Sequence, residues 1–155
     1  MSELSKTAIF SFPASYVIDL RWRELRQGMP IETAHFEGDE LKTTKHYGLV
    51  YPYPPYETSE LASCVTFMLN EHEGKQAWQL RGMVTEKQYQ GKGFGRMLLA
   101  STTKNLADKS GIRLFWCNAR KVAIKFYEKQ GWAVVGPEFD IKDAGLHCVM
   151  SYEQK

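Results

Sequence analysis

The stretch "QYQGKGFGRMLL", residues 88–99, places three glycines within five positions directly before a run of helix-forming residues. Because Gly91, Gly93 and Gly95 have no Cβ, a ligand can approach the backbone amides of such a loop closely. A helix that begins here adds unpaired amides and the positive end of its dipole, and both favour an anion. The stretch therefore predicts a phosphate site at the start of a helix, or else a simple turn.

The spacing of the glycines excludes the two commonest nucleotide-binding loops. A Walker loop requires Ser or Thr after its lysine, and here Lys92 is followed by Gly93. A dinucleotide fingerprint that starts at Gly91 would need a third glycine where Arg96 stands, and one that starts at Gly93 would need it at Leu98. A module that binds ATP or NAD is therefore a weaker hypothesis for this loop.

Hydrophobic periodicity along the chain predicts a mixed α/β protein. Helical spacing indicates helices at 14–28, 94–109 and 119–131, the last with Val122 against Phe126 and Ala123 against Tyr127. Strand-like runs lie at 46–53, 61–69, 77–85, 113–118, 132–137 and 147–153, with hairpin connections at 53–60 and 70–76. Antiparallel hairpins followed by a strand–helix–strand unit favour a three-layer mixed sheet, in a single domain of residues 1–155.

Composition limits the class of protein. The chain is 43% apolar and 25% charged with a formal charge of +2, which is typical of a globular protein and too weakly basic for a nucleic-acid partner. The apolar run at 8–20 is interrupted and too short to span a membrane. Three scattered cysteines, without CxxC spacing, predict no metal site and fit a reducing, cytoplasmic location.

The glycine loop and its neighbours resemble one enzyme family. The pattern Gln90-x-x-Gly93-x-Gly95 resembles the Q/R-x-x-G-x-G/A signature of the GNAT superfamily, the GCN5-related N-acetyltransferases. Residues 80–85, "LRGMVT", are similar to the family's fourth strand, and residues 118–132, "NARKVAIKFYEKQGW", to its later Asn-to-FYEKxGF block. Within that block Ala123 falls two positions later than the family's N-x-x-A spacing.

Two further segments, 20–32 and 138–150, resemble small stand-alone bacterial members of the family. The resemblance implies the GNAT acyl-CoA N-acyltransferase fold, in which the central strands splay apart, and acetyl-CoA as co-substrate. The pyrophosphate would lie on the loop and the pantetheine arm along the fourth strand. The implied cofactor-binding residues are Met83, Val84, Thr85, Gln90, Gly91, Lys92, Gly93, Phe94, Gly95, Arg96, Asn118 and Tyr127. Asn118 could instead be a helix cap.

Acetyl transfer to an amine requires two proton movements. Tyr127 matches the family's tyrosine that donates a proton to the leaving sulfur, although a buried aromatic beside Phe126 is the alternative. Many relatives have a glutamate base on the fourth strand, but here Arg81 stands there and cannot act as a base. His147 is the best substitute, with a purely structural histidine as the alternative.

The amine acceptor is not specified by these motifs. Acids and a histidine at Glu37, Asp39, Glu40 and His46 either attract a cationic amine or form a solvated acidic loop. Residues 51–57, "YPYPPYE", suggest a hairpin loop near the substrate rather than a polyproline ligand, and Cys117 suggests a buried strand residue rather than a nucleophile.

The leading hypothesis is therefore an N-acetyltransferase that transfers the acetyl group directly to a primary amine in a ternary complex. The alternative is a catalytically silent GNAT domain that binds coenzyme A as a sensor or scaffold. Polyamines, aminoglycosides, amino acids, other small amines and protein N-termini all remain open as acceptors. Exposed strand edges allow a homodimer.

Overall fold

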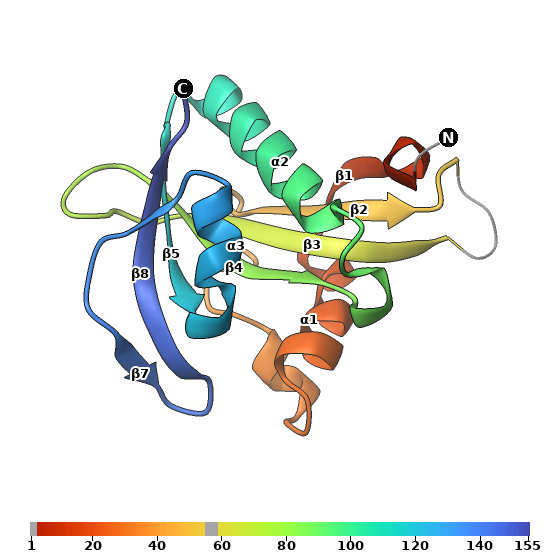
Figure 1. Ribbon diagram of the computed structural model, residues 1–155, viewed down its shortest axis with the longest axis horizontal. Helices are drawn as coiled ribbons and strands as arrows, with labels where there is room; N and C mark the ends of the chain where they lie inside the picture. Colours follow the sequence, from red (N-terminus) through yellow and green to blue (C-terminus); the bar gives the residue numbers. More distant parts are fainter. Residues whose placement is uncertain (1–2, 55–58) are drawn as a thin grey trace. The chain divides into compact units, whose positions relative to one another are not determined.

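The computed structural model describes residues 3–54 and 59–155 and confirms a mixed α/β sheet (Figure 1). The strands are β1 (Ala8–Phe12), β2 (Lys45–Tyr51), β3 (Glu60–Leu69), β4 (Trp78–Thr85), β5 (Leu114–Arg120), β6 (Ala133–Val134), β7 (Phe139–Ile141) and β8 (Gly145–Glu153). The α-helices are α1 (Ile18–Leu25), α2 (Phe94–Ser110) and α3 (Ile124–Lys129). Short 3-10 helices are η1 (Glu3–Lys6), η2 (Ala14–Tyr16), η3 (Ile31–Ala34), η4 (Lys87–Tyr89) and η5 (Lys121–Ala123).

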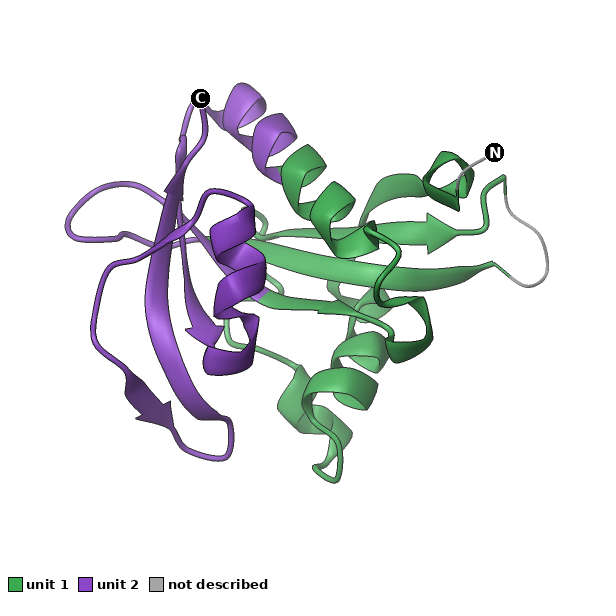
Figure 2. Ribbon diagram, viewed as in Figure 1, with its two compact units in different colours: residues 1–68, 82–102 green, residues 69–81, 103–155 purple. Residues whose placement is uncertain are grey.

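The strand order is β1-β2-β3-β4-β5-β8-β6, and β7 pairs with β8. By its internal contacts the chain divides into two compact units, which Figure 2 colours separately. Unit 1 comprises residues 1–68 and 82–102, and unit 2 comprises residues 69–81 and 103–155. That residues 1–155 form one domain stays a prediction.

In unit 1, α1 packs against β3 through a small apolar core. Val17, Leu20 and Cys64 are buried there, and Leu61 and Val84 pack around them. The predicted helix at 14–28 is shorter than expected and is split into η2 and α1. The backbone leaves the helical region directly after α1, so the periodic pattern continues further than the helix does.

The sequence pattern missed β1, the strand that pairs antiparallel with β2 from Ala8↔Val50 to Phe12↔His46. Its five residues form part of the apolar run at 8–20, which was considered above only as a membrane span. Within the described ranges, none of the helices combines the length and the apolar character needed to cross a bilayer. The run is apolar because it contributes a strand to the sheet.

In unit 2, β5 is paired on both sides. It runs antiparallel to β8 from Leu114↔Glu153 to Arg120↔His147, and parallel to β4 from Trp78↔Phe115 to Leu80↔Cys117. The parallel register ends at Leu80 in the described part of the chain, although β4 continues to Thr85.

The helix predicted at 119–131 begins later than expected. Ala119 and Arg120 still belong to β5, where they pair with β8, so η5 and α3 form only after them. Val122 is 92% exposed, and the expected packing of Val122 against Phe126 is therefore wrong. Tertiary pairing with β8 overrides the local helical spacing here.

Other predicted elements differ mainly in their ends. The strand expected at 132–137 is reduced to β6, and β7 was missed, whereas α2 closely matches the predicted 94–109. The hairpin at 70–76 is confirmed by reciprocal backbone hydrogen bonds between His72 and Lys75. The other predicted connection, 53–60, includes residues 55–58, which lie outside the described residues.

A buried ion pair lies at the centre of unit 1. Arg21 is fully buried, and its Nη1 and Nη2 donate to the two oxygens of Asp39 at 2.7 and 3.1 Å. Burial by itself would raise the pKa of the Asp39 carboxyl, but the hydrogen bonds and charge of Arg21 hold that pKa below its ordinary value of 3.8.

Replacement of Asp39 by Asn is expected to lower the free energy of unfolding by about 3–5 kcal/mol near neutral pH, because Arg21 would remain buried without its partner. Since the folded pKa of Asp39 is depressed, its contribution is present above the unfolded pKa and is lost as the pH falls through the lower folded value. Urea unfolding at about pH 7 and about pH 3 should show the difference between wild type and Asp39→Asn narrowing in acid. An equal difference at both pH values would contradict this.

Candidate functional site

The glycine loop turns the chain from η4 into α2 through a left-handed backbone. Gly91 and Gly93 have φ values of +83° and +85°, a region that side chains with a Cβ rarely occupy. The first helical hydrogen bond runs from the Met97 amide to the Gly93 carbonyl at 3.0 Å. The amides of residues 94–96 therefore lie in the first turn of α2 without an acceptor inside the helix, as an anion site requires.

Aromatic packing and one amide side chain anchor this loop. Phe94 is 1% exposed, and its ring centroid lies 5.0 Å from that of Tyr51 and 6.2 Å from that of Tyr89. Gln90, the first residue of the signature, donates from Nε2 to the carbonyl of Thr85 at 3.0 Å. The signature glutamine thus ties the loop to the end of β4, and the amides are held in place before any ligand arrives.

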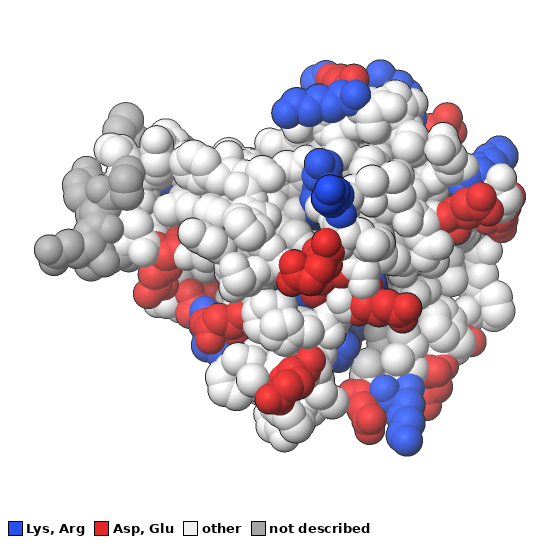
Figure 3. Space-filling view, turned by 180° about the vertical axis from the view of Figure 1, so that it is seen from behind, with Lys and Arg blue, Asp and Glu red and all other residues white. Residues whose placement is uncertain are grey.

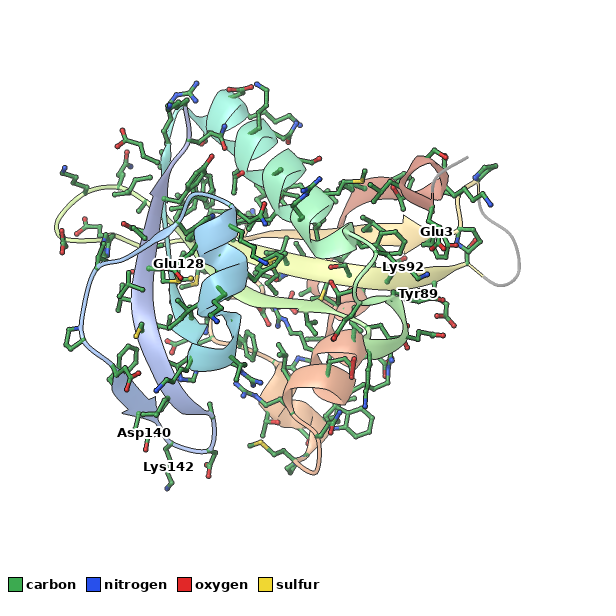
Figure 4. All side chains as sticks on the ribbon, viewed as in Figure 1. Glu3, Tyr89, Lys92, Glu128, Asp140 and Lys142 are labelled. Carbon is green, nitrogen blue, oxygen red and sulfur yellow. The ribbon has the colours of Figure 1, made fainter. Side chains whose placement is uncertain are left out.

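The cationic side chains of the loop lie at its rim. Arg96 is exposed, and Lys92 Nζ lies 2.8 Å from a carboxylate oxygen of Glu3 in η1. This contact raises the pKa of Lys92 and lowers that of Glu3. Figure 4 shows Glu3, Lys92 and Tyr89 gathered at the same end of the sheet. Sequence reasoning missed Glu3 because it lies near the start of the chain, far from its partner Lys92, and no local pattern links the two residues.

The predicted pantetheine segment, Met83 to Thr85, is the last part of β4. On its β3 side, Ser63 Oγ donates to the Val84 carbonyl at 3.0 Å and lies 2.9 Å from Thr85 Oγ1. The parallel register with β5 ends at Leu80, before this segment begins. The backbone of the segment is therefore held by β3 and is not included in the β5 ladder.

Tyr127 is buried on α3 in unit 2. Its ring centroid lies 5.4 Å from that of Phe126 and 5.3 Å from that of Trp132. Burial, with a smaller effect of nearby Cys117, raises the pKa of Tyr127 well above its ordinary value. The hydroxyl therefore keeps its proton at neutral pH and can act as a hydrogen-bond donor. Burial also raises the pKa of the Cys117 thiol to about 12, which supports the expected buried strand cysteine.

Asn118 lies within β5 with its side chain exposed. The strand continues to Arg120, which is the residue that precedes η5. The alternative that Asn118 caps a helix is therefore wrong, and a role in ligand binding stays a prediction.

His147 is buried on β8, where its Nδ1 lies 2.7 Å from the Gly145 carbonyl. A carbonyl oxygen only accepts, so Nδ1 carries the hydrogen and donates it. The lone pair of a neutral ring then lies on Nε2. This tautomer is the one that a proton acceptor acting through Nε2 needs.

The residues expected near the acceptor do not form one group. Glu37 and Glu40 are exposed, whereas Asp39 and His46 are buried in the Arg21 network of unit 1. The solvated acidic loop therefore does not include Asp39, whose carboxylate is already paired. Arg81 lies half-buried on β4, where many relatives have a glutamate base.

A pocket of about 420 Å³ in unit 1 was not anticipated from the sequence. In its wall Arg23 bridges Asp19 Oδ2 at 2.8 Å and Glu86 Oε1 at 2.7 Å. The lining residues are Tyr16, Asp19, Leu20, Arg23, Glu60, Leu61 and Glu86. Its carboxylates come from α1, from β3 and from the residue that follows β4, so no single stretch of the sequence indicates the pocket.

Charge elsewhere is dispersed. On the face shown in Figure 3, basic and acidic side chains are interspersed among uncharged ones. Within residues 3–54 and 59–155, no three His, Cys, Asp or Glu side chains come together as a metal site would need.

Comparison with known proteins identifies the family. The model of the acetyltransferase (GNAT) domain matches residues 56–134. The chain is also 32% identical over 132 residues to YitI of Bacillus subtilis (strain 168), an uncharacterized N-acetyltransferase, with 85% of this chain and 86% of that protein covered. The chain belongs to the GNAT family of acetyltransferases. The expected enzyme class, an acetyl-CoA-dependent acyltransferase, is thereby confirmed.

Solved structures agree on the GNAT fold. Escherichia coli ElaA has a TM-score of 0.74 at 13% identity, covering 94% of this chain and 99% of its own. An aminoglycoside 6'-N-acetyltransferase complexed with coenzyme A has a TM-score of 0.70 at 15% identity, covering 94% and 96%. Arabidopsis thaliana NAA60, in complex with acetyl-CoA, has a TM-score of 0.71 at 12% identity, covering 95% and 98%. The roles of individual residues in this GNAT chain stay predictions.

Replacement of Glu3 by Gln is expected to lower the KM for acetyl-CoA about threefold, because it releases Lys92 from an exposed ion pair and removes a negative charge beside the phosphate loop. Initial rates at varied acetyl-CoA would measure the change. Asp108→Asn is the matched control, since it removes the same charge from another exposed lysine pair, Lys104–Asp108. An equal KM for Glu3→Gln and wild type would show that Glu3 does not compete for Lys92.

Proposed function

We propose that this GNAT enzyme transfers the acetyl group of acetyl-CoA directly to a primary amine in a ternary complex. The observation that carries the proposal is the anchored loop before α2, with left-handed backbone at Gly91 and Gly93 and first-turn amides that have no acceptor inside the helix. Membership of the GNAT family supports acetyl-CoA as the ligand of this loop. This family assignment also removes the hypothesis of an ATP or NAD module.

The proposed donor site uses backbone more than side chains. The pyrophosphate accepts hydrogen bonds from the loop amides, with Lys92 and Arg96 adding charge at the rim. The pantetheine amides pair with the backbone of Met83 to Thr85, as an added strand would. Asn118 contributes a further polar contact to the cofactor. The residues that supply the loop amides are Gly91, Lys92, Gly93, Phe94, Gly95 and Arg96.

The proposed chemistry begins with a neutral amine. Deprotonating an alkylammonium of pKa near 10.4 at pH 7 costs about 4.6 kcal/mol. His147 accepts this proton on Nε2, directly or through a water, and its Nδ1–H stays bonded to the Gly145 carbonyl. The amine nitrogen then attacks the thioester carbonyl, and a new carbon–nitrogen bond forms.

Collapse of the tetrahedral intermediate breaks the carbon–sulfur bond. Tyr127 donates its hydroxyl proton to the leaving thiolate, which becomes the free thiol of coenzyme A. The attacking nitrogen loses its second proton as the amide forms, and a proton returns through solvent to the Tyr127 phenolate. Because burial raises the pKa of Tyr127, its hydroxyl is protonated at neutral pH and is available as the donor at this step. A catalytically silent domain is not favoured, because the chain retains a protonated tyrosine in the family's block and matches an N-acetyltransferase over most of its length.

Replacement of Tyr127 by Phe is expected to lower kcat about 100-fold with little change in the KM for acetyl-CoA, because it removes only the proton donor and keeps the ring packing. Release of free thiol, measured with a mixed panel of primary amines, gives the rates. Calorimetry with coenzyme A should show unchanged binding. If wild type binds coenzyme A but acetylates no amine, the silent alternative replaces this proposal.

His147→Asn is expected to lower kcat by a similar factor of about 100, because asparagine can still donate to the Gly145 carbonyl but has no basic nitrogen. His72→Asn is the control, since His72 stacks on Trp116 in a hairpin and has no proposed role. The same thiol-release assay distinguishes the two variants. A His147→Asn enzyme as fast as the control would assign the proton to another base.

A further inference from the structure

We propose that Arg21 is a positioning residue for the acyl-CoA segment of β4. Its clamped guanidinium sets the backbone conformation of Gly82 and thereby the direction of Met83 to Thr85. The inference rests on the proposed function, in which this segment pairs with the pantetheine arm. All residues that carry it belong to unit 1.

The guanidinium of Arg21 is held in one place. Besides the two bonds to Asp39, Nη1 donates to the Ala34 carbonyl at 3.0 Å and Nη2 donates to Thr66 Oγ1 at 2.7 Å. The Phe36 ring covers its face, with the ring centroid 4.1 Å from Cζ. A side chain with four hydrogen bonds, a stacked ring and no exposed surface has a single available rotamer.

Further hydrogen bonds fix Asp39 and Thr66, the side-chain partners of Arg21. The Phe36 amide donates to Asp39 Oδ2 at 2.8 Å, and His46 Nε2 lies 2.9 Å from the Asp39 carbonyl, which can only accept. A neutral His46 ring that carries its hydrogen on Nε2 accepts at Nδ1, so the Thr66 hydroxyl donates to it at 2.7 Å while its oxygen accepts from Arg21. Together these hydrogen bonds form a closed network of Arg21, Asp39, His46 and Thr66, in which the donor and the acceptor of each bond are fixed.

The third nitrogen of the guanidinium, Arg21 Nε, lies close to Gly82 of β4. Gly82 has φ of +57°, far from the value near −120° of a regular strand, so the chain turns at this residue. A Cβ at Gly82 would lie 2.6 Å from Arg21 Nε and 3.0 Å from Phe36 Cε2. Arg21 Nε has no hydrogen-bond acceptor among the described residues, so it acts on Gly82 by occupying space.

The other side of Gly82 is also constrained. Cys64 Sγ donates to the Gly82 carbonyl at 3.7 Å from β3. Gly82 therefore lies between β3 and the guanidinium, directly before the three residues proposed to pair with pantetheine. Any change in its φ would rotate the peptide groups that follow.

Stability alone does not require an arginine here. Buried ion pairs can often be replaced by apolar residues of similar volume without loss of stability. A guanidinium is a rigid plane, and here four hydrogen bonds fix its position. An apolar side chain of the same volume would have no such bonds to fix it. We therefore assign its role to the geometry of β4.

The test compares two ligands on folded variants. Acetyl-CoA reaches both the loop and the pantetheine segment, whereas 3′-phospho-ADP carries the pyrophosphate and has no pantetheine arm. Gly82→Ala, and the paired variant Arg21→Met with Asp39→Asn, are each expected to weaken acetyl-CoA binding about tenfold and to leave 3′-phospho-ADP binding unchanged. Calorimetry gives the dissociation constants, and urea unfolding confirms that each variant is folded.

Gly28→Ala is the matched control, because Gly28 has φ of +78° and open space around the position of a Cβ. It carries the same backbone strain without the contact with Arg21 and should bind both ligands as wild type does. Equal binding of acetyl-CoA by wild type, Gly82→Ala and the paired variant would overturn the inference, as would equal weakening of both ligands. Should the paired variant not fold, Gly82→Ala decides alone. Failure of wild type to bind acetyl-CoA would instead remove the proposed function.

Discussion

The buried pair of Arg21 and Asp39 is the interaction on which unit 1 depends. Two charges removed from water carry a large desolvation cost, which only close mutual contact and complete hydrogen bonding can offset. The pair meets both conditions, with a bidentate contact and further bonds to Ala34 and Thr66. These bonds join α1, η3 and β3, segments that local propensity alone would leave independent.

The glycines of β4 and of the phosphate loop show two different uses of the same residue. At Gly82 there is no room for a Cβ, since Arg21 Nε lies 2.6 Å from where it would stand. At Gly91 there is open space around that position, and the left-handed backbone is what requires glycine. Gly82 is therefore required both by packing and by its left-handed backbone, whereas Gly91 is required by the backbone alone. Both lie in or beside the backbone segments that are proposed to bind the donor.

Features with a local cause were predictable from the sequence, and those with a distant cause were not. The loop and α2 follow from glycine spacing and helical periodicity within about 20 residues. The start of α3 was misplaced because Arg120 pairs with His147 across the sheet, and β1 was missed because its partner β2 lies far along the chain. The burial of Asp39 depends on Arg21, which an acidic stretch on its own does not reveal. Of the candidate site, the glycine loop proposed to bind an anion could be predicted from the sequence. The network beneath β4 and the pocket of Arg23 were not.

Burial in unit 2 raises the pKa of two side chains, the Tyr127 hydroxyl and the Cys117 thiol, with a different consequence for each. It raises the pKa of Tyr127 well above its ordinary value and that of Cys117 to about 12. For the tyrosine the consequence is a hydroxyl that remains a donor at neutral pH. For the cysteine it is a thiol that hardly ionises, and thiolate is the form that could accept an acetyl group. The same desolvation that keeps Tyr127 protonated also keeps the Cys117 thiol protonated, which disfavours a covalent acetyl-cysteine at this position. This is consistent with the direct transfer proposed above.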